Sequence, residues 1–379
     1  MRKLILGIAL VLAGATMAGA KDMTGKKVYI NAGHGGYWNG GYVAAETDSL
    51  GNIITSRKGN DRFVATIPFP DESETGYWES KSNLVKSLEL RRLLVAAGCD
   101  VKMSRVRNRE IDDKDLEHIG LDANEFLGEA AAENPANVAF IAVHSNALGG
   151  NNRGINYFLN LYNMDADTLG KNADYMELGK TMANESALWL MDNEITVWKP
   201  SAPKVWEDNK FLGFTLGVLR HLDVPGFLVE GSFHDYAPET HRLLNDDYCK
   251  LSAYNMYRFF CDYFKADMPS TGVVAGAVKH NKKILVDKNF GNCVEGTHDC
   301  LLPINGAVVT LLNKNGKKLQ TYITDEFYNG VYVFWDIKPG KYKVKIEADG
   351  FETQILEIKV KAAEITDQVT LLNDPNYVE

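Results

Sequence analysis

The sequence predicts an α/β domain with a mainly parallel sheet flanked by helices, followed by a small all-β sandwich domain. Between residues 26 and 264, short apolar runs alternate with segments of 3.6-residue periodicity. From residue 272 onward, only short alternating runs separated by turns remain, which is the spacing of a β-sandwich. Residues 268–272, MPSTG, lie between these regions and have the composition of a linker.

The first twenty residues have the pattern of a secretory signal peptide. Arg2 and Lys3 precede an apolar run over residues 4–12, too short to span a bilayer, and small residues follow at 18–20. We expect cleavage after Ala20 and a secreted protein, periplasmic or extracellular. The residue immediately after the expected cleavage site is not a cysteine, so no lipid anchor is expected there. No later segment is predicted to span a membrane.

The chain is acidic. Its 379 residues include 41 Lys and Arg against 50 Asp and Glu, a formal net charge of −9. Loss of Arg2 and Lys3 with the signal peptide leaves 39 against 50, or −11. An acidic protein gains nothing from counterion release at phosphates, so nucleic acid is not an expected partner.

Two domains are expected after the signal peptide, over residues 21–267 and 268–379. In the first, apolar runs predict strands at residues 28–30, 100–103, 138–143, 154–159 and 226–229. Periodic segments predict helices at residues 82–97, 121–132, 173–191 and 246–264. Residues 37–78 form a long polar and aromatic insertion, and loops of this length are usually functional or carry secondary structure of their own.

The five cysteines leave two interpretations open. Cys293 and Cys300 have a spacing that suits a loop-closing disulfide, as an oxidising compartment would permit. Cys249 and Cys261 lie on one predicted helix and point away from each other. Alternatively, all five are buried free thiols.

Three predicted strands deliver an ionisable side chain at their carboxyl ends. His34 follows the first strand in a glycine-rich turn, His144 follows an almost wholly apolar strand, and Glu230 follows the apolar run of residues 227–229. The carboxyl ends of parallel strands meet at one edge of a sheet, so these side chains are expected to lie together. A single histidine in a loop would not by itself indicate a site.

Two imidazoles and one carboxylate, with one position left for water, make up the usual catalytic zinc site. A further carboxylate is needed to take the proton from that water. Two acids are therefore required. Glu79 stands at the start of a predicted helix, a favourable place for an anion, and Glu230 is the other candidate.

The order of these motifs resembles the zinc-dependent N-acetylmuramoyl-L-alanine amidases that trim bacterial peptidoglycan. That family opens with a strand and a Gly-His-Gly-Gly loop, as in residues 33–36 here. The matching blocks that follow are Glu79 with Asn83-Leu84, then Gly98 and Ser104-Arg105, then His144-Ser145-Asn146, then residues 154–158, and finally residues 218–220, Pro225 and Leu228-Val229-Glu230. The resemblance extends over about residues 26–264 in the right order.

The resemblance implies that His34, Glu79 and His144 bind Zn²⁺ and that Glu230 is the catalytic carboxylate. The bond cleaved would be the amide between N-acetylmuramic acid and L-alanine, in peptidoglycan or in muropeptides. Two other functions stay open: a zinc peptidase acting on ordinary peptides, and an inactive cell-wall-binding module.

The sequence also departs from the family pattern. Asn31-Ala32 replaces the common Asp-Pro, and Ser232-Phe233 replaces a Gly-Phe after the catalytic glutamate. The insertion lengthens the interval between His34 and the next ligand, so Glu46 and Glu74 rival Glu79. These departures suggest a divergent member with altered substrate preference.

The C-terminal region resembles the carboxypeptidase regulatory-like β-sandwich domains appended to secreted bacterial proteins. The resemblance rests on LPINGAVVTLLNKNGK, TYITDEFYNGVYVF and IKPGKYKVKIEADGFET, and it implies a fold and no catalysis. His234 and His241 could line the site, although polar loop histidines are mostly solvated. The remaining histidines are expected at the surface, and they are His118, His221, His280 and His298.

Overall fold

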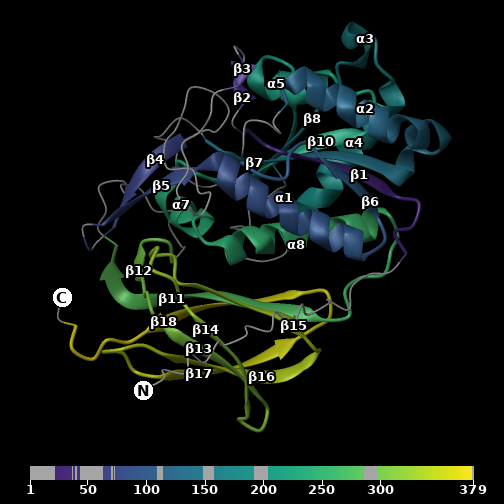
Figure 1. Cartoon of the computed structure of the whole chain (residues 1–379). Helices are drawn as coiled ribbons and strands as arrows, with labels where there is room; N and C mark the ends of the chain where they lie inside the picture. Colours follow the sequence, from purple (N-terminus) through teal and green to yellow (C-terminus); the bar gives the residue numbers. More distant parts are fainter. Residues whose placement is uncertain are drawn as a thin grey trace, which may run out of the picture.

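A computed structural model gives the architecture of the chain (Figure 1). It describes residues 22–35, 37–38, 41–42, 63–69, 71, 73–108, 114–147, 158–191, 204–285 and 298–377. The predicted signal peptide and Glu46 lie outside these residues. No helix in the described ranges is both long enough and apolar enough to cross a membrane.

The first domain is built on a six-stranded sheet in the order β6-β1-β7-β10-β8-β9. Its strands are β1 (Lys27–Ala32), β6 (Asp100–Met103), β7 (Val138–Asn146), β8 (Phe158–Tyr162), β9 (Val205–Glu207) and β10 (Gly226–Phe233). Every pairing is parallel except that between β8 and β10. The mainly parallel sheet predicted from the alternating pattern is confirmed.

Helices cover both faces of this sheet. They are α1 (Glu79–Ala96), α2 (Leu116–Glu133), α3 (Ala166–Leu169), α4 (Ala173–Leu190), α5 (Asp208–Leu212), α6 (Gly217–Arg220), α7 (Ala237–Leu243) and α8 (Asp246–Tyr263), with a 3-10 turn at Pro135–Asn137. The apolar faces of α1, α4 and α8 share one core with one face of the sheet. The apolar faces of α2 and α6 pack on the other face. These are the two layers that a parallel sheet needs to bury both sides.

The predicted elements are present, but several bounds differ. The strand expected at residues 154–159 is β8, which begins at Phe158, and residues 154–157 lie outside the described ranges. The strands predicted at residues 138–143 and 226–229 extend to Asn146 and Phe233, so His144 and Glu230 stand within strands rather than after them. The first long helix begins three residues early, at Glu79 itself. Polar residues continue the two strands because β7 and β10 supply each other with backbone partners that a hydropathy pattern does not reveal.

The C-terminal domain is a sandwich of two four-stranded sheets, as predicted. Its strands are β11 (Gly272–Ile284), β12 (Leu301–Pro303), β13 (Val308–Asn313), β14 (Lys318–Ile323), β15 (Val331–Ile337), β16 (Gly340–Glu347), β17 (Gln354–Val360) and β18 (Ile365–Leu372). One sheet contains β12, β11 and β15, with β18 also paired to β11, and the other has the order β14-β13-β16-β17. Their inner faces enclose a core that includes Val309, Leu311, Val344 and Ile346.

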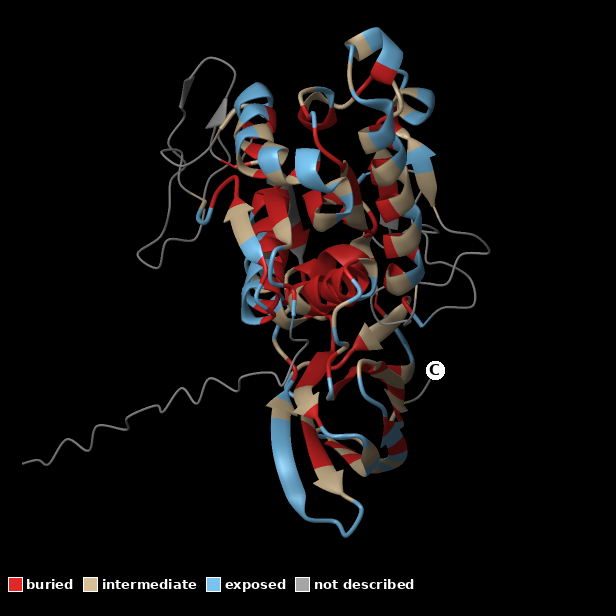
Figure 2. Ribbon diagram, turned by 90° about the vertical axis from the view of Figure 1, so that its right-hand side faces the viewer, coloured by how far each residue is buried: buried red, intermediate tan, exposed pale blue. Residues whose placement is uncertain are grey.

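Helix α8 lies between the two domains and is buried almost along its whole length (Figure 2). Phe259 contacts Phe227 of β10, at 5.7 Å between ring centroids, and Tyr254 contacts Trp335 of β15 at 6.1 Å. Arg258, fully buried, donates to the carbonyl oxygen of Ala363 in the sandwich at 3.0 Å. One continuous hydrophobic cluster therefore includes residues of both domains.

The described parts of the insertion contain two short antiparallel hairpins. They consist of β2 (Tyr37–Trp38) with β3 (Gly41–Tyr42), and β4 (Phe63–Pro68) with β5 (Glu74–Trp78). The second hairpin leads directly into α1, so it sets where Glu79 begins the helix.

The cysteines follow the prediction in part. Cys249 and Cys261 are buried free thiols, as is Cys99. Cys300 is disulfide-bonded, whereas Cys293 lies outside the described residues. The pairing of Cys293 with Cys300 stays a prediction.

Candidate metal and catalytic site

The loop that carries His34 follows β1 and is held by Arg105. His34 has a backbone φ of 59°, in the left-handed region that few non-glycine residues adopt. The guanidinium of Arg105 donates to the carbonyl oxygens of Ala32, Gly33 and His34 at 2.8–2.9 Å. It also donates to the carbonyl oxygen of Ser80, in the first turn of α1, at 2.9 Å. The strained turn and the start of α1 therefore share one buried anchor.

His144 stands on β7, beside the loop of His34. The two imidazole rings lie 4.8 Å apart between centroids, at an interplanar angle of 83°. Gly33 makes this approach possible, because a Cβ atom there would lie under 3.0 Å from three atoms of the His144 ring. The glycine before His34 is therefore a packing requirement of the second histidine as well as part of a turn.

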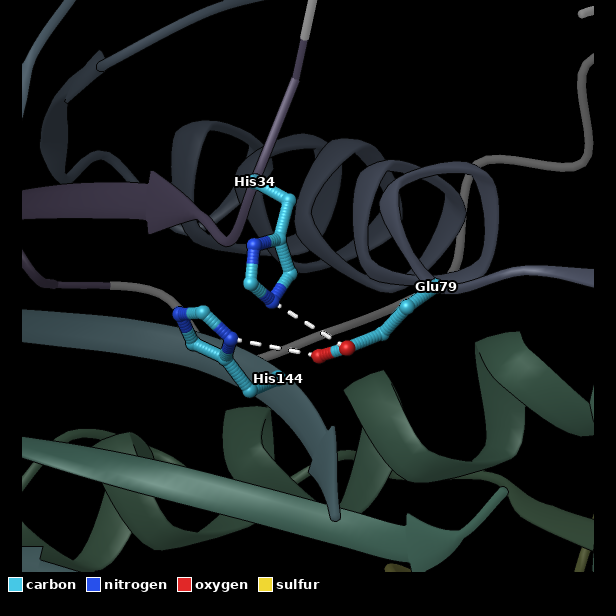
Figure 3. A group of neighbouring side chains, drawn as sticks. All are labelled: His34, Glu79 and His144. Carbon is cyan, nitrogen blue, oxygen red and sulfur yellow. Dashed lines mark hydrogen bonds and ion pairs between the residues drawn. The ribbon is translucent and has the colours of Figure 1, made fainter. Parts of the chain in front are cut away.

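Glu79 reaches between the two histidines from the first residue of α1 (Figure 3). Its Oε2 lies 3.1 Å from Nε2 of His34, and its Oε1 lies 3.2 Å from Nδ1 of His144. Asn83 and the backbone N–H of Ser145 each donate to Oε1 at 3.2 Å. The three side chains offer ligand atoms that all lie within 4.8 Å of one another.

The surroundings of Glu79 favour the charged form of its carboxyl group. Burial by itself opposes its charge, but the neighbouring imidazoles of His34 and His144 outweigh that penalty and hold the pKa of Glu79 well below its usual value. A buried anion between two imidazoles is a ready ligand set for a divalent cation. Zinc ligands at about 2.0–2.2 Å from the ion are themselves about 3–4 Å apart, and the Glu79–histidine distances match this separation.

Glu230 lies on β10, directly across from His144 in the parallel register. The strand is irregular between Glu230 and Phe233, and Ser232 has a φ of 71° within this bulge. Glu230 lines the same cleft as the His-Glu-His cluster. The register thus brings the second carboxylate to the site without making it part of the cluster.

Lys86 is a site residue that the sequence did not single out. It is fully buried on α1, and its ammonium donates to the carbonyl oxygens of His144, at 3.3 Å, and Gly231, at 2.7 Å. Burial lowers its pKa. Lys86 joins the two strands that carry His144 and Glu230. The sequence around it carries no signal of this role, because three of the four residues one helical turn away are polar.

A buried chain of polar groups runs behind Glu79. The Tyr77 hydroxyl lies 2.7 Å from Oγ of Ser82 and 2.9 Å from Oγ of Ser145. Ser145 Oγ in turn lies 3.1 Å from Nδ1 of His234, which lines the cleft. This chain connects the insertion hairpin, α1, β7 and the end of β10 around the site.

These side chains open into a cleft of about 320 Å³. Its lining includes the polar groups of the site. It also includes an apolar wall formed by Leu116, Ile119, Leu216, Val218 and Leu228. A few convergent polar groups beside an apolar surface are typical of a small-molecule or substrate site.

The structure brings together His34, Glu79, His144 and Glu230, and leaves the rival Glu74 exposed on β5. Of the two possibilities left open for His234 and His241, solvation is wrong, because both are buried where α7 packs back on β10. His234 lines the cleft. Thr240 of α7 donates to the carbonyl oxygen of His234 at 2.8 Å.

The surface position expected for His280 is also wrong. His280 is 2% exposed, and its Nδ1 accepts hydrogen bonds from the backbone N–H groups of Lys282 and Lys283. His118 and His298 are exposed, as predicted, and His221 is half-buried. A polar residue inside a strand becomes buried when a bend in the backbone supplies its partners.

The fold and the site define an α/β protein with a candidate metal centre of two imidazoles and a carboxylate, beside a second carboxylate in the same cleft. The sequence profile of the family described as N-acetylmuramoyl-L-alanine amidase matches residues 28–259. The chain therefore belongs to the N-acetylmuramoyl-L-alanine amidase family. A second profile, the carboxypeptidase regulatory-like domain, matches residues 302–372. No curated protein sequence matches the chain.

Several solved structures are similar to this chain at low identity. An N-acetylmuramoyl-L-alanine amidase from Clostridium difficile 630 is 17% identical, with a TM-score of 0.42, over 63% of this chain and 97% of that one. An amidase from Mycobacterium smegmatis is 15% identical, with a TM-score of 0.42, over 64% and 98%. An amidase from Nostoc punctiforme is 16% identical, with a TM-score of 0.39, over 64% and 98%.

Proposed function

We propose that this chain is a secreted, zinc-dependent N-acetylmuramoyl-L-alanine amidase that acts on peptidoglycan or its fragments. The signal peptide occupies residues 1–20, the catalytic domain residues 21–267 and the β-sandwich residues 268–379. The observation that carries the proposal is the His34–Glu79–His144 cluster in one cleft with Glu230. Membership of the amidase family supports the choice of bond.

Zinc fits the donor set because imidazole nitrogen and carboxylate oxygen are its usual ligands in catalytic sites. His34, Glu79 and His144 would hold it, and it would supply a Lewis acid that polarises the amide carbonyl and acidifies water. Arg105 and Gly33 keep the two histidines in place for this.

Glu230 is the general base and then the general acid. It takes a proton from the attacking water as the oxygen adds to the carbonyl carbon of the lactyl group. It gives that proton to the leaving nitrogen as the carbon–nitrogen bond breaks. The products are the lactyl carboxylate and the free amino group of L-alanine. The apolar wall of the cleft suits the methyl groups that flank this bond.

Metal analysis of the purified wild type and a Glu79→Ala variant tests the ligand set. We expect about one zinc ion per wild-type chain and its loss in the variant, since removal of one of three protein ligands opens the site. Glu74→Ala is the control and is expected to retain zinc. Zinc retained by Glu79→Ala and lost from Glu74→Ala would reassign the third ligand.

Digestion of purified muropeptides tests the reaction. We expect release of free stem peptides by the wild type and a rate at least about 100-fold lower for Glu230→Gln, with its zinc content unchanged. Cleavage confined to peptides that lack muramic acid would instead make the protein a zinc peptidase. Zinc binding without any turnover would make it a wall-binding module.

A further inference from the structure

Exposed aromatic side chains occur together in one short segment of the chain, residues 206–214. Among the described side chains, the exposed phenylalanine and tryptophan residues are Trp206, Phe211 and Phe214, at 48%, 41% and 54% exposure. The rings of Trp206 and Phe211 lie 5.8 Å apart between centroids, at 32° to each other. We call these three residues the aromatic platform. Large exposed apolar groups that cluster mark an interaction site more often than single ones do.

The residues of the aromatic platform are held by defined elements and hydrogen bonds of the fold. Trp206 lies on β9, one of the two edge strands of the sheet, and Phe211 lies on α5. Asp208, fully buried, accepts hydrogen bonds from the backbone N–H groups of Asn209, at 2.7 Å, and Leu216, at 2.9 Å. One carboxylate therefore ties both ends of the segment that carries Phe211 and Phe214, and holds it in a compact turn.

The aromatic platform continues the apolar wall of the cleft. Trp206 pairs with Leu161, and Leu161 with Leu228, so these three positions share one face of the sheet, and Leu228 lines the cleft. The segment after Phe214 supplies Leu216, which lines the cleft as well. The exposed rings are thus an extension of the site away from the metal ligands.

We propose that the aromatic platform binds sugar rings of the peptidoglycan glycan strand. The inference rests on the proposed amidase function and names the part of its substrate that this surface recognises. Sugar rings offer C–H groups of positive character, which pack on the negative faces of aromatic rings. The Glu207–Lys210 ion pair, at 2.6 Å, borders the same segment and provides polar groups for sugar hydroxyls.

Sugar binding by the aromatic platform would make the protein prefer some substrates of a peptidoglycan amidase over others. A lone muramoyl peptide is recognised by the cleft, whereas a glycan strand also covers the aromatic platform. The platform therefore favours strands of several sugars over single-sugar fragments, through binding rather than through the chemical step. Loss of the platform is expected to raise KM for strands and leave kcat and the KM for single-sugar fragments unchanged.

The test measures binding without cleavage. The full chain carrying Glu230→Gln is titrated with peptide-free glycan strands and, separately, with free stem peptides. Trp206→Ala and Phe214→Ala are expected to weaken glycan binding about tenfold each. Trp206→Tyr and Phe214→Tyr keep an aromatic face and should restore most of the affinity. Leu188→Ala, at an exposed apolar position on α4, is the matched control and should bind as the parent does.

Glycan binding that is unchanged by Trp206→Ala and Phe214→Ala, or weakened equally by Leu188→Ala, would overturn the inference. So would a loss of affinity for free stem peptides alone. The two proposals fail separately. A wild type that binds glycan through the platform but cleaves no amide refutes the amidase function, and one that cleaves muropeptides with platform-independent binding refutes only the inference.

Discussion

At the scale of single residues, the site depends on close approaches between side chains. Glu79 lies within 3.1–3.2 Å of both histidines, and the His144 ring occupies the space that a side chain at residue 33 would need. A ligand set of this kind is sensitive to shifts of a few tenths of an ångström, because metal–ligand distances vary little.

Gly33→Ala tests this sensitivity. The new methyl group would overlap the His144 ring, so the ring must move away from Glu79. We expect zinc affinity to fall at least about tenfold, measured by competition with a chelator. Gly128→Ala is the control, since the space around Gly128 is open and it lies on α2. Unchanged zinc affinity in a folded Gly33→Ala protein would contradict the role assigned to Gly33.

At the scale of elements, the register of the parallel strands brings most of the site residues together. His144 and Glu230 are direct partners on β7 and β10, and Ala32, two residues before His34, pairs with Val143. Lys86 then bonds carbonyl oxygens of both β7 and β10 from α1, the helix that Glu79 begins. The positions of the site residues are therefore set by the pairing of the strands, and α1 is hydrogen-bonded to β7 and β10 near their carboxyl ends.

Asp208 gives the α5 segment a pH-dependent stability. Burial raises its pKa to about 6 from an ordinary value of 3.8. A raised carboxyl pKa in the folded state means that its contribution to stability is present below pH 3.8 and is lost as the pH rises through about 6.

Asp208→Asn removes that pH dependence. The free energy of unfolding of the wild type, minus that of Asp208→Asn, should decrease by about 1–3 kcal/mol between pH 3.5 and pH 7. Chemical denaturation at both pH values measures it, and the difference cancels the titration of other groups. A difference that is constant with pH, or that rises, would contradict the assignment.

At the scale of the whole molecule, the two domains share one interior. Val273, Ala275 and Val331 of the sandwich belong to the same hydrophobic cluster as Phe227 and Phe259 of the first domain. The sandwich also contacts the segments around the site. Phe69, in the insertion, packs its ring 5.5 Å from His241 of α7 and 6.1 Å from Phe327.

These contacts predict that the mature chain unfolds in one step. Scanning calorimetry should give a single transition with equal calorimetric and van't Hoff enthalpies, because the hydrophobic cluster that contains α1, α4 and α8 also includes residues of the sandwich. Thr321→Ala, on the exposed outer surface of β14, is a control that should leave the shape of the transition unchanged. Two resolved transitions would show that the shared cluster does not couple the domains.

Much of the fold could be predicted from the sequence because it depends on local patterns. The apolar runs of β1, β7 and β10 and the periodicity of α2, α4 and α8 carry their own signal. The ends of the strands carry no such local signal, since His144 and Glu230 continue strands whose hydrogen-bond partners are remote in sequence. The buried states of His241 and His280 were missed for the same reason.

The alternation of elements, the order of the motifs and the kinds of side chain near the strand ends can all be read from the sequence, because they depend on neighbours along the chain. Tertiary structure alone decided that Glu79 rather than Glu74 lies between the histidines, that Lys86 joins two strands, and that the domains share a core. Those outcomes depend on distances between residues far apart in sequence, which only the folded packing sets.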